Sequence, residues 1–446
     1  MKKITFLLAM MLVTFTACHN EDFEEISLES KREKISYEVT PEEAVSRLGM
    51  FLSNKGTRAS LNDVTIKTLM KSDFVPTTRS SDVEDAPAVY LIDIPDGGCA
   101  VMGADKRLEP VYAIMDETKL SPEDLVATST RTESTGEEDI QTFVTGLIND
   151  AVEADIMGLG PFPKDTTELI PNPYPHEEIW DETTMLKQIA PILNTKWHQQ
   201  QSPFYNNFPR DHLNRHEAAG CGTIALAQLI YHHRRPNNIN GIIFDWNLIR
   251  QYAYGYELTP TQSAKVEIAN FVYITALAVN ADWSREAYGT TTSLSDIANL
   301  MSQSGYFHVG VSDYNYNAID YMLDDELPVI VRGADSSDVN GSRHIWLIDG
   351  CKNYKIDHWI RLYKNPHIMI DELPYEEHIT STDTYNLFHC NYGYGGYYDG
   401  YYPSGLFDMR DQLPEDRIDT SVGDIAGNNL TCLDTGLYMI PYSLNY

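Results

Sequence analysis

The chain has 446 residues, and 42% of them are hydrophobic, which is enough to bury the cores of more than one domain. Acidic residues outnumber basic ones by 65 to 33, so the net charge is -32, and we expect no nucleic-acid partner. The six cysteines include no CxxC pair, which argues against a zinc site and a dense disulfide framework. The sequence leaves open whether Cys99, Cys351, Cys390 and Cys432 pair.

Residues 1–18 have the features of an export signal. Lys2 and Lys3 precede an apolar run from Ile4 to Val13, and small residues lead up to Cys18. The end of this segment, Phe15 to Cys18, resembles the lipobox of bacterial lipoproteins, in which the cysteine is lipidated. We therefore expect an exported cell-envelope protein, on the outer surface or in the periplasm, that a lipid at Cys18 anchors to a membrane. Ordinary secretion is the alternative.

Residues 19–126 are predicted to form a small α+β module. Thr40 to Glu43 have the form of a capping box with proline at the first helical position, and apolar residues follow at helical spacing. Three strands are predicted at residues 88–94, 99–103 and 110–115, and a turn at 95–98 joins the first two. The module has no evident catalytic group.

Residues 127–185 are predicted to link this module to a second domain, residues 186–446. The segment 127–140 is polar, a helix is expected from Phe143 to Met157, and a proline-rich run ends at Pro175. An exposed segment between two packed modules is a site where proteolytic nicking is expected.

Cys221 lies between two glycines at the predicted start of a helix that Pro236 ends. The positive end of the helix dipole favours a thiolate over a thiol, and a thiolate is a nucleophile. The alternative for this residue is a buried structural cysteine. A nucleophilic cysteine also needs a base, a group that holds the base, and donors for the oxyanion.

His344 is the preferred base because it begins an apolar strand, although a solvent-exposed strand end would fit the same pattern. His389 is the second candidate, whereas His232 and His233 lie about three helical turns from the thiol. Asn391 ends a strand before a glycine-rich turn, where its side chain could accept a hydrogen bond from the imidazole.

Taken together, four segments resemble the streptopain family of bacterial papain-like cysteine peptidases. They are Trp197 to Asn206, Ala219 to Gln228, Arg343 to Gly350, and His389 to Gly396. The N-terminal module resembles the propeptide of that family, notably over residues 97–107. The resemblance implies an α+β fold: a papain-like two-lobed catalytic domain, with a helical lobe and an antiparallel β lobe, preceded by a small α+β prodomain.

The resemblance also implies roles for single residues. Cys221 would be the nucleophile and His344 the base, with Asn391 and Tyr392 supporting the histidine. A glutamine of the 199–201 run would stabilise the oxyanion. Counting from Trp197 selects Gln199, which we prefer, and counting back from Pro203 selects Gln200.

Substrate contacts are implied at Ser293, Arg343 and Tyr392. Ser293 ends a loop that matches a substrate-binding segment of the family but is shorter. Arg343 replaces a small residue, so it would narrow the cleft or favour acidic substrate residues. Tyr392 and Tyr394 replace two tryptophans, which would weaken the shielding of the catalytic pair.

The sequence therefore predicts the zymogen of a cysteine endopeptidase that hydrolyses proteins or peptides through an acyl-enzyme. Its own prodomain would act as an intramolecular inhibitor, and cleavage between residues 127 and 185 would separate the active domain from the anchor at Cys18. No metal or organic cofactor is implied. A catalytically weak or inactive surface binding lipoprotein on the same scaffold is the alternative. A transglutaminase-like acyl transferase ranks lower, because those enzymes usually hold the histidine with aspartate.

Overall fold

The structure is a computed structural model that describes residues 37–52, 61, 63–75, 86–95, 97–126, 137–157, 177–256, 258–283, 290–334, 343–363, 375–406 and 437–444. The chain divides into a short unit, Met1–Tyr37, and a large one, Glu38–Tyr446, and every helix and strand described lies in the large unit. The predicted signal segment and Cys18 lie outside the described residues. Within those residues, no helix is both long enough and apolar enough to span a membrane.

The N-terminal module is a four-stranded antiparallel sheet with helices packed against it. Thr40 Oγ1 accepts a hydrogen bond from Glu43 N at 3.2 Å, and the first helix begins at Pro41, as predicted. The sequence predicted three strands of this sheet and did not predict the first, β1. The stretch that contains β1 was too polar to indicate a strand. The elements are α1 (Pro41–Leu52), β1 (Thr65–Met70), α2 (Lys71–Phe74), β2 (Pro87–Asp93), β3 (Cys99–Gly103), β4 (Val111–Met115) and α3 (Pro122–Val126).

The sheet of this module continues into the sheet of the C-terminal part of the chain. Its order is β1-β2-β3-β4-β12-β11-β10-β9-β13-β8, and β5 pairs separately with β10. The joint is the pairing of β4 with β12, where Gly400 opposes Met115 and Tyr401 opposes Ile114. The additional strands are β5 (Glu177–Ile189), β8 (Ser312–Asp313), β9 (Val329–Ala334), β10 (Arg343–Tyr363), β11 (Tyr375–Asn391), β12 (Gly400–Pro403) and β13 (Tyr438–Ile440).

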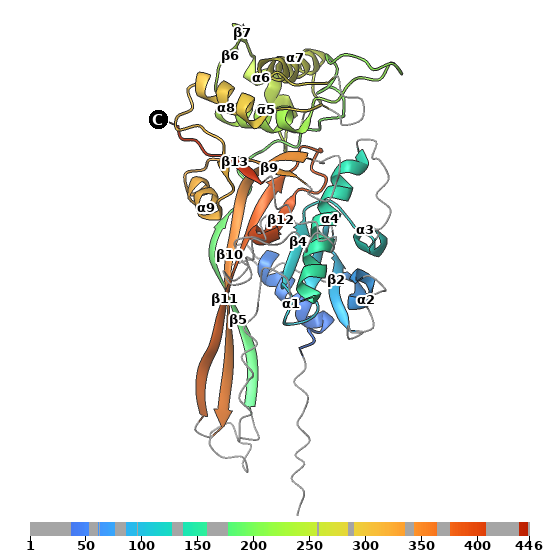
Figure 1. The fold of residues 1–446 in the computed structure, drawn as a ribbon, viewed down its shortest axis with the longest axis vertical. Coiled ribbons are helices and arrows are strands. Elements are labelled where there is room, and N and C mark those ends of the chain that lie inside the picture. Colours follow the sequence, from blue (N-terminus) through green and yellow to red (C-terminus); the bar gives the residue numbers. More distant parts are fainter. Residues whose placement is uncertain are drawn as a thin grey trace, which may run out of the picture. The chain divides into compact units, whose positions relative to one another are not determined.

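Helices α6, α7 and α8 lie near α5 (Figure 1). α5 (Cys221–His233) packs against α7 (Gln262–Ala278), α8 (Leu294–Gln303) and strand β10. The smaller elements are β6 (Asn238–Ile239), β7 (Ile242–Ile243), α6 (Trp246–Ile249), η2 (Arg250–Tyr252), α9 (Tyr316–Asp324) and η3 (Ser404–Leu406). A helical part next to an antiparallel sheet confirms the predicted α+β class.

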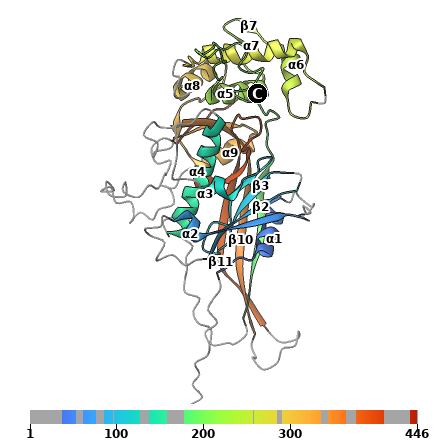
Figure 2. The ribbon, with the colours of Figure 1, turned by 90° about the vertical axis from the view of Figure 1, so that its right-hand side faces the viewer.

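Two ordered elements lie in the range predicted to be a linker. Helix α4 (Glu137–Ile156) packs on β2 and β4 and reaches η3 (Figure 2). Strand β5 pairs with β10 from Ile189 to Glu177, so it belongs to the sheet that also carries His344. The predicted boundary between residues 185 and 186 therefore falls inside a strand.

The N-terminal module and the C-terminal sheet also share a hydrophobic core. Phe51 of α1 packs edge-on against Tyr354 of β10, with ring centroids 4.4 Å apart. The Phe51 carbonyl oxygen accepts hydrogen bonds from Lys352 Nζ at 2.7 Å and from the Tyr354 hydroxyl at 2.9 Å. Apolar burial and these hydrogen bonds together hold α1 on the sheet.

Candidate active site

Cys221 is the first residue of α5, and it is partly exposed. The preceding Gly220 has φ +88°, a conformation that disfavours any residue with a Cβ. A Cβ at Gly220 would also lie 2.9 Å from Thr290 Cγ2, so Thr290 packs directly against the residue that precedes Cys221. Glycine is therefore required where the chain enters the helix.

The start of β10 lies beside the start of α5. A Cβ added to Gly222, the residue after Cys221, would lie 3.0 Å from Ile345 Cδ1, and Ile345 follows His344. A Cβ added to Gly393 would lie 3.1 Å from Ile224 Cγ2, so the glycine-rich turn also touches the first turn of α5. The fold therefore brings together the segments that carry the predicted nucleophile, base and orienting group.

His344 is 7% exposed, and its Nε2 lies 3.0 Å from the carbonyl oxygen of Tyr392. A carbonyl oxygen only accepts, so the hydrogen bond assigns the ring proton to Nε2 and leaves Nδ1 as the basic nitrogen. Burial lowers the pKa of His344 from 6.5 to about 4, although the hydrogen bond to Tyr392 opposes the shift. The imidazole is therefore neutral at physiological pH.

Aromatic rings surround His344. The ring centroids of Phe143, Tyr394 and Tyr392 lie 5.7, 5.7 and 5.8 Å from that of the histidine, and Trp346 stacks at 6.3 Å. Phe143 belongs to α4, which the sequence assigned to the linker. Its part in the site was missed, and the signal that could have indicated it is the apolar face of that helix, which must be buried against something.

Asn391 is not joined to His344 in this structure. Its Nδ2 donates to the Thr195 carbonyl at 2.9 Å, and its Oδ1 accepts from Gln228 Nε2 at 3.1 Å and from Gly393 N at 3.2 Å. The acceptor for the histidine is instead the main-chain carbonyl of the next residue, Tyr392.

Gln199 lies between the glycine-rich turn and the loop that leads to Cys221. Its N–H donates to Gly393 O at 3.1 Å, and its carbonyl accepts from Ala219 N at 2.8 Å. Its side-chain amide is buried and donates to the Tyr394 hydroxyl. Gln200 is less buried, and its N–H donates to His198 Nδ1 at 3.0 Å. Of the two glutamines, Gln199 is the one that is hydrogen-bonded to the loop that leads to Cys221.

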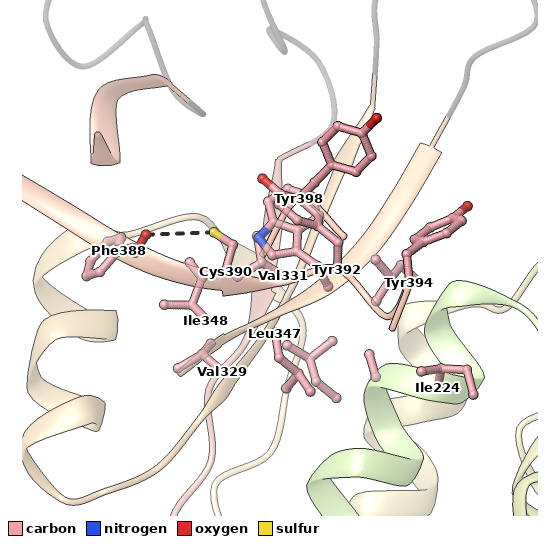
Figure 3. Packing of buried hydrophobic residues seen from close by; sticks show 14 of the residues in the cluster. Ile224, Val329, Val331, Leu347, Ile348, Phe388, Cys390, Tyr392, Tyr394 and Tyr398 are labelled. Carbon is pink, nitrogen blue, oxygen red and sulfur yellow. Dashed lines mark hydrogen bonds between the residues drawn. The ribbon is translucent and has the colours of Figure 1, made fainter. Parts of the chain in front are cut away.

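The three residues predicted to contact the substrate differ in how far the structure describes them. Ser293 is the N-cap of α8, where its hydroxyl accepts from Ser295 N at 3.1 Å and from Asp296 N at 3.4 Å. Tyr392 is fully buried among sheet residues such as Val331 and Cys390, whereas Tyr394 lies toward Ile224 of α5 (Figure 3). The side chain of Arg343 lies outside the described residues. The structure thus buries the Tyr392 ring, whereas Ser293 is exposed, and a substrate contact at Ser293 stays a prediction.

The second histidine candidate, His389, is held by two carboxylates. Its Nδ1 lies 2.6 Å from Asp349 Oδ1, and its Nε2 lies 3.2 Å from Asp116 Oδ2. Burial lowers the pKa of His389, but Asp349 and Asp116 outweigh it and raise the pKa to about 10. Two carboxylates that favour the charged imidazole make a poor general base of His389, so it remains the weaker candidate. Asp116 comes from the N-terminal module, and no local signal in the sequence links the two.

A family model and solved structures are similar to parts of this chain. Residues 197–402 match the model of the Peptidase C10 family. Among solved structures, a prointerpain A fragment of Prevotella intermedia is 15% identical to this chain. The alignment covers 86% of this chain and 99% of the fragment, with a TM-score of 0.48. Active interpain A cysteine protease of the same organism is 16% identical. That alignment covers 58% of this chain and 96% of the protease, with a TM-score of 0.38. No curated protein matches the chain. The match to the Peptidase C10 family, the streptopain family of cysteine peptidases, covers residues 197–402 and includes Cys221 and His344, and it identifies this part of the chain as a cysteine peptidase.

Proposed function

We propose that this cysteine peptidase is an endopeptidase zymogen that is exported and anchored by lipid at Cys18, with Cys221 as nucleophile and His344 as base. One observation carries the catalytic part of the proposal. The start of α5, the start of β10, Gln199 and the glycine-rich turn meet at one place inside the region that matches the family.

The chemistry follows from the roles of these groups. His344 Nδ1 takes the proton of the Cys221 thiol, and the thiolate sulfur bonds to the carbonyl carbon of the scissile peptide while the π electrons move to its oxygen. The Gln199 amide and the Cys221 N–H stabilise that oxyanion. His344 then gives its proton to the leaving amine as the C–N bond breaks. Water, deprotonated by His344, hydrolyses the thioester and restores the thiol.

The latent state is supported by the contacts of the N-terminal elements. Phe143 of α4 covers His344, and the resulting burial disfavours the imidazolium that must form during catalysis. The Gln199 amide is engaged with the Tyr394 hydroxyl and would have to leave it to reach an oxyanion. β4 pairs with β12, and Lys196 Nζ lies 2.6 Å from Glu117 Oε1, so the module is held on the catalytic part of the chain.

Activation requires that the N-terminal elements leave. Cleavage between α4 and β5 would disconnect residues 19–156 from the rest of the chain while keeping β5 in its sheet. Because Cys18 lies on the N-terminal side of that cut, the lipid would stay with the released module. The peptidase would then become soluble.

Self-cleavage is tested with the purified full-length chain. Cys221→Ala and His344→Ala should both abolish the conversion to a shorter product, which mass spectrometry follows. His378→Ala, an exposed histidine on β11, is the control and should convert at the wild-type rate. If Cys221→Ala converts normally, self-cleavage is wrong. Failure of the epoxide E-64 to label Cys221 after the module is removed would favour the inactive surface binding lipoprotein.

The anchor is tested separately by metabolic labelling with a radioactive fatty acid. Label should enter the full-length chain and disappear in a Cys18→Ser variant. An unlabelled wild-type chain would favour ordinary secretion.

A further inference from the structure

Gln228 occupies a buried position on the helix that carries the nucleophile. It lies about two turns beyond Cys221 on α5 and is completely buried. Both ends of its side-chain amide are used: Oε1 accepts from Trp197 N at 3.4 Å, and Nε2 donates to Asn391 Oδ1 at 3.1 Å. The residue therefore connects α5 to two other segments of the site.

The contacts of Asn391 carry this connection to the histidine. Asn391 Oδ1 accepts from Gly393 N at 3.2 Å, and this N–H belongs to the peptide unit whose carbonyl, that of Tyr392, lies 3.0 Å from His344 Nε2. A peptide unit is planar, so holding its N–H also fixes the direction of its C=O. Asn391 thus acts on His344 through one peptide unit.

We infer that Gln228 is a positioning residue for His344. It holds Asn391 in the orientation that fixes the 392–393 peptide unit, and the carbonyl of that unit selects the ring tautomer with Nδ1 unprotonated. This inference rests on the proposed role of His344 as the base. Because α5 carries both Cys221 and Gln228, one helix sets the position of the thiol and of the turn that holds the imidazole.

The chemistry of the site requires an amide at position 228. Gln228 Oε1 accepts from Trp197 N and Gln228 Nε2 donates to Asn391 Oδ1, so the two ends of one side-chain amide serve an N–H donor and an oxygen acceptor. Methionine has a similar size but offers neither function, whereas glutamate keeps the acceptor and the shape but loses the donor. Gln228 and Asn391 make a second contact, from Asn391 Nδ2 to Gln228 Oε1. At 3.5 Å it is too long to replace the hydrogen bond from Gln228 Nε2 to Asn391 Oδ1.

A tautomer measurement tests the inference on the full-length Cys221→Ala chain, which cannot cleave itself. Nitrogen-15 NMR of labelled histidine reports which ring nitrogen of His344 carries the proton, and a His344→Asn chain assigns the signal. We expect a single Nε2–H form with Gln228 and a mixture of both tautomers in Gln228→Met. The control is Gln303→Met at the exposed end of α8, which should leave the signal unchanged. If Gln228→Met does not fold, Gln228→Glu serves as the second variant.

A kinetic measurement on the Cys221-containing chain completes the test. Misplacing a catalytic group by about 1 Å costs roughly 100-fold in rate, so Gln228→Met should lower kcat by about 10- to 100-fold with little change in KM. An unchanged tautomer together with an unchanged kcat would overturn the inference. A wild-type chain without peptidase activity after removal of the N-terminal module would instead refute the proposed function, and the NMR signal would still report on the hydrogen bonds from Gln228 to His344.

Discussion

Replacing Phe143 with alanine tests whether α4 keeps His344 neutral. Phe143 is buried, and its ring centroid lies 5.7 Å from that of His344. Burial is the largest cause of the fall in the pKa of His344 from 6.5 to about 4, and removing the whole shift would change the free energy of protonation by about 3 kcal/mol. Phe143 is one of several rings around the imidazole, so its loss should raise the pKa by about one pH unit.

The assay is an NMR titration of His344 in the full-length Cys221→Ala chain. A phenylalanine-to-alanine change in a core costs about 3 to 5 kcal/mol, so urea denaturation must show that the variant is folded. Phe51→Ala is the matched control, because Phe51 is also buried between the module and the sheet but packs on Tyr354. The control should leave the pKa of His344 at about 4. Equal shifts in the two variants, or none in Phe143→Ala, would refute the reasoning.

Two further changes test other contacts. Asp116→Asn removes one of the carboxylates that raise the pKa of His389 to about 10, against 6.5 ordinarily. The stability from this pair is complete below about pH 6.5 and is lost as the pH rises toward 10, so the difference in Tm from wild type should shrink over that range. A difference independent of pH would contradict this assignment. Gly220→Ala should cost about 1 to 2 kcal/mol more than Gly222→Ala in urea denaturation, because only Gly220 has a left-handed backbone, at φ +88°. Equal costs would show that backbone conformation is not the cause.

Local signals predicted the elements that depend on neighbouring residues. The capping box and proline before residue 44 placed the start of α1 at Pro41, and the glycines around Cys221 placed the start of α5. The turn at residues 95–98 placed the start of β3, which spans Cys99–Gly103 as predicted. Each of these features is determined by a few consecutive residues, so the sequence alone was sufficient.

Contacts between distant segments could not be read in this way. Phe143 and His344 are far apart in the chain, and nothing in either segment specifies the other. Asn391 was expected to bind the imidazole directly, but the competing partners Thr195 and Gln228 take its hydrogen bonds. Family motifs identify which residues meet at a site. They do not specify which hydrogen bonds those residues make when an N-terminal module covers it.

The pairing of β4 with β12 has a consequence for the handling of the mature enzyme. When the module leaves, β12 becomes the edge strand of the remaining sheet, and Tyr401 loses the apolar residues of the module that pack with it. Exposed edge strands pair with other chains and promote aggregation. β12 is short and ends at Pro403, which has no N–H to donate, and both features limit such pairing. Even so, one edge of β12 is unpaired only in the free peptidase, so we expect the free peptidase to be more prone to aggregation than its precursor.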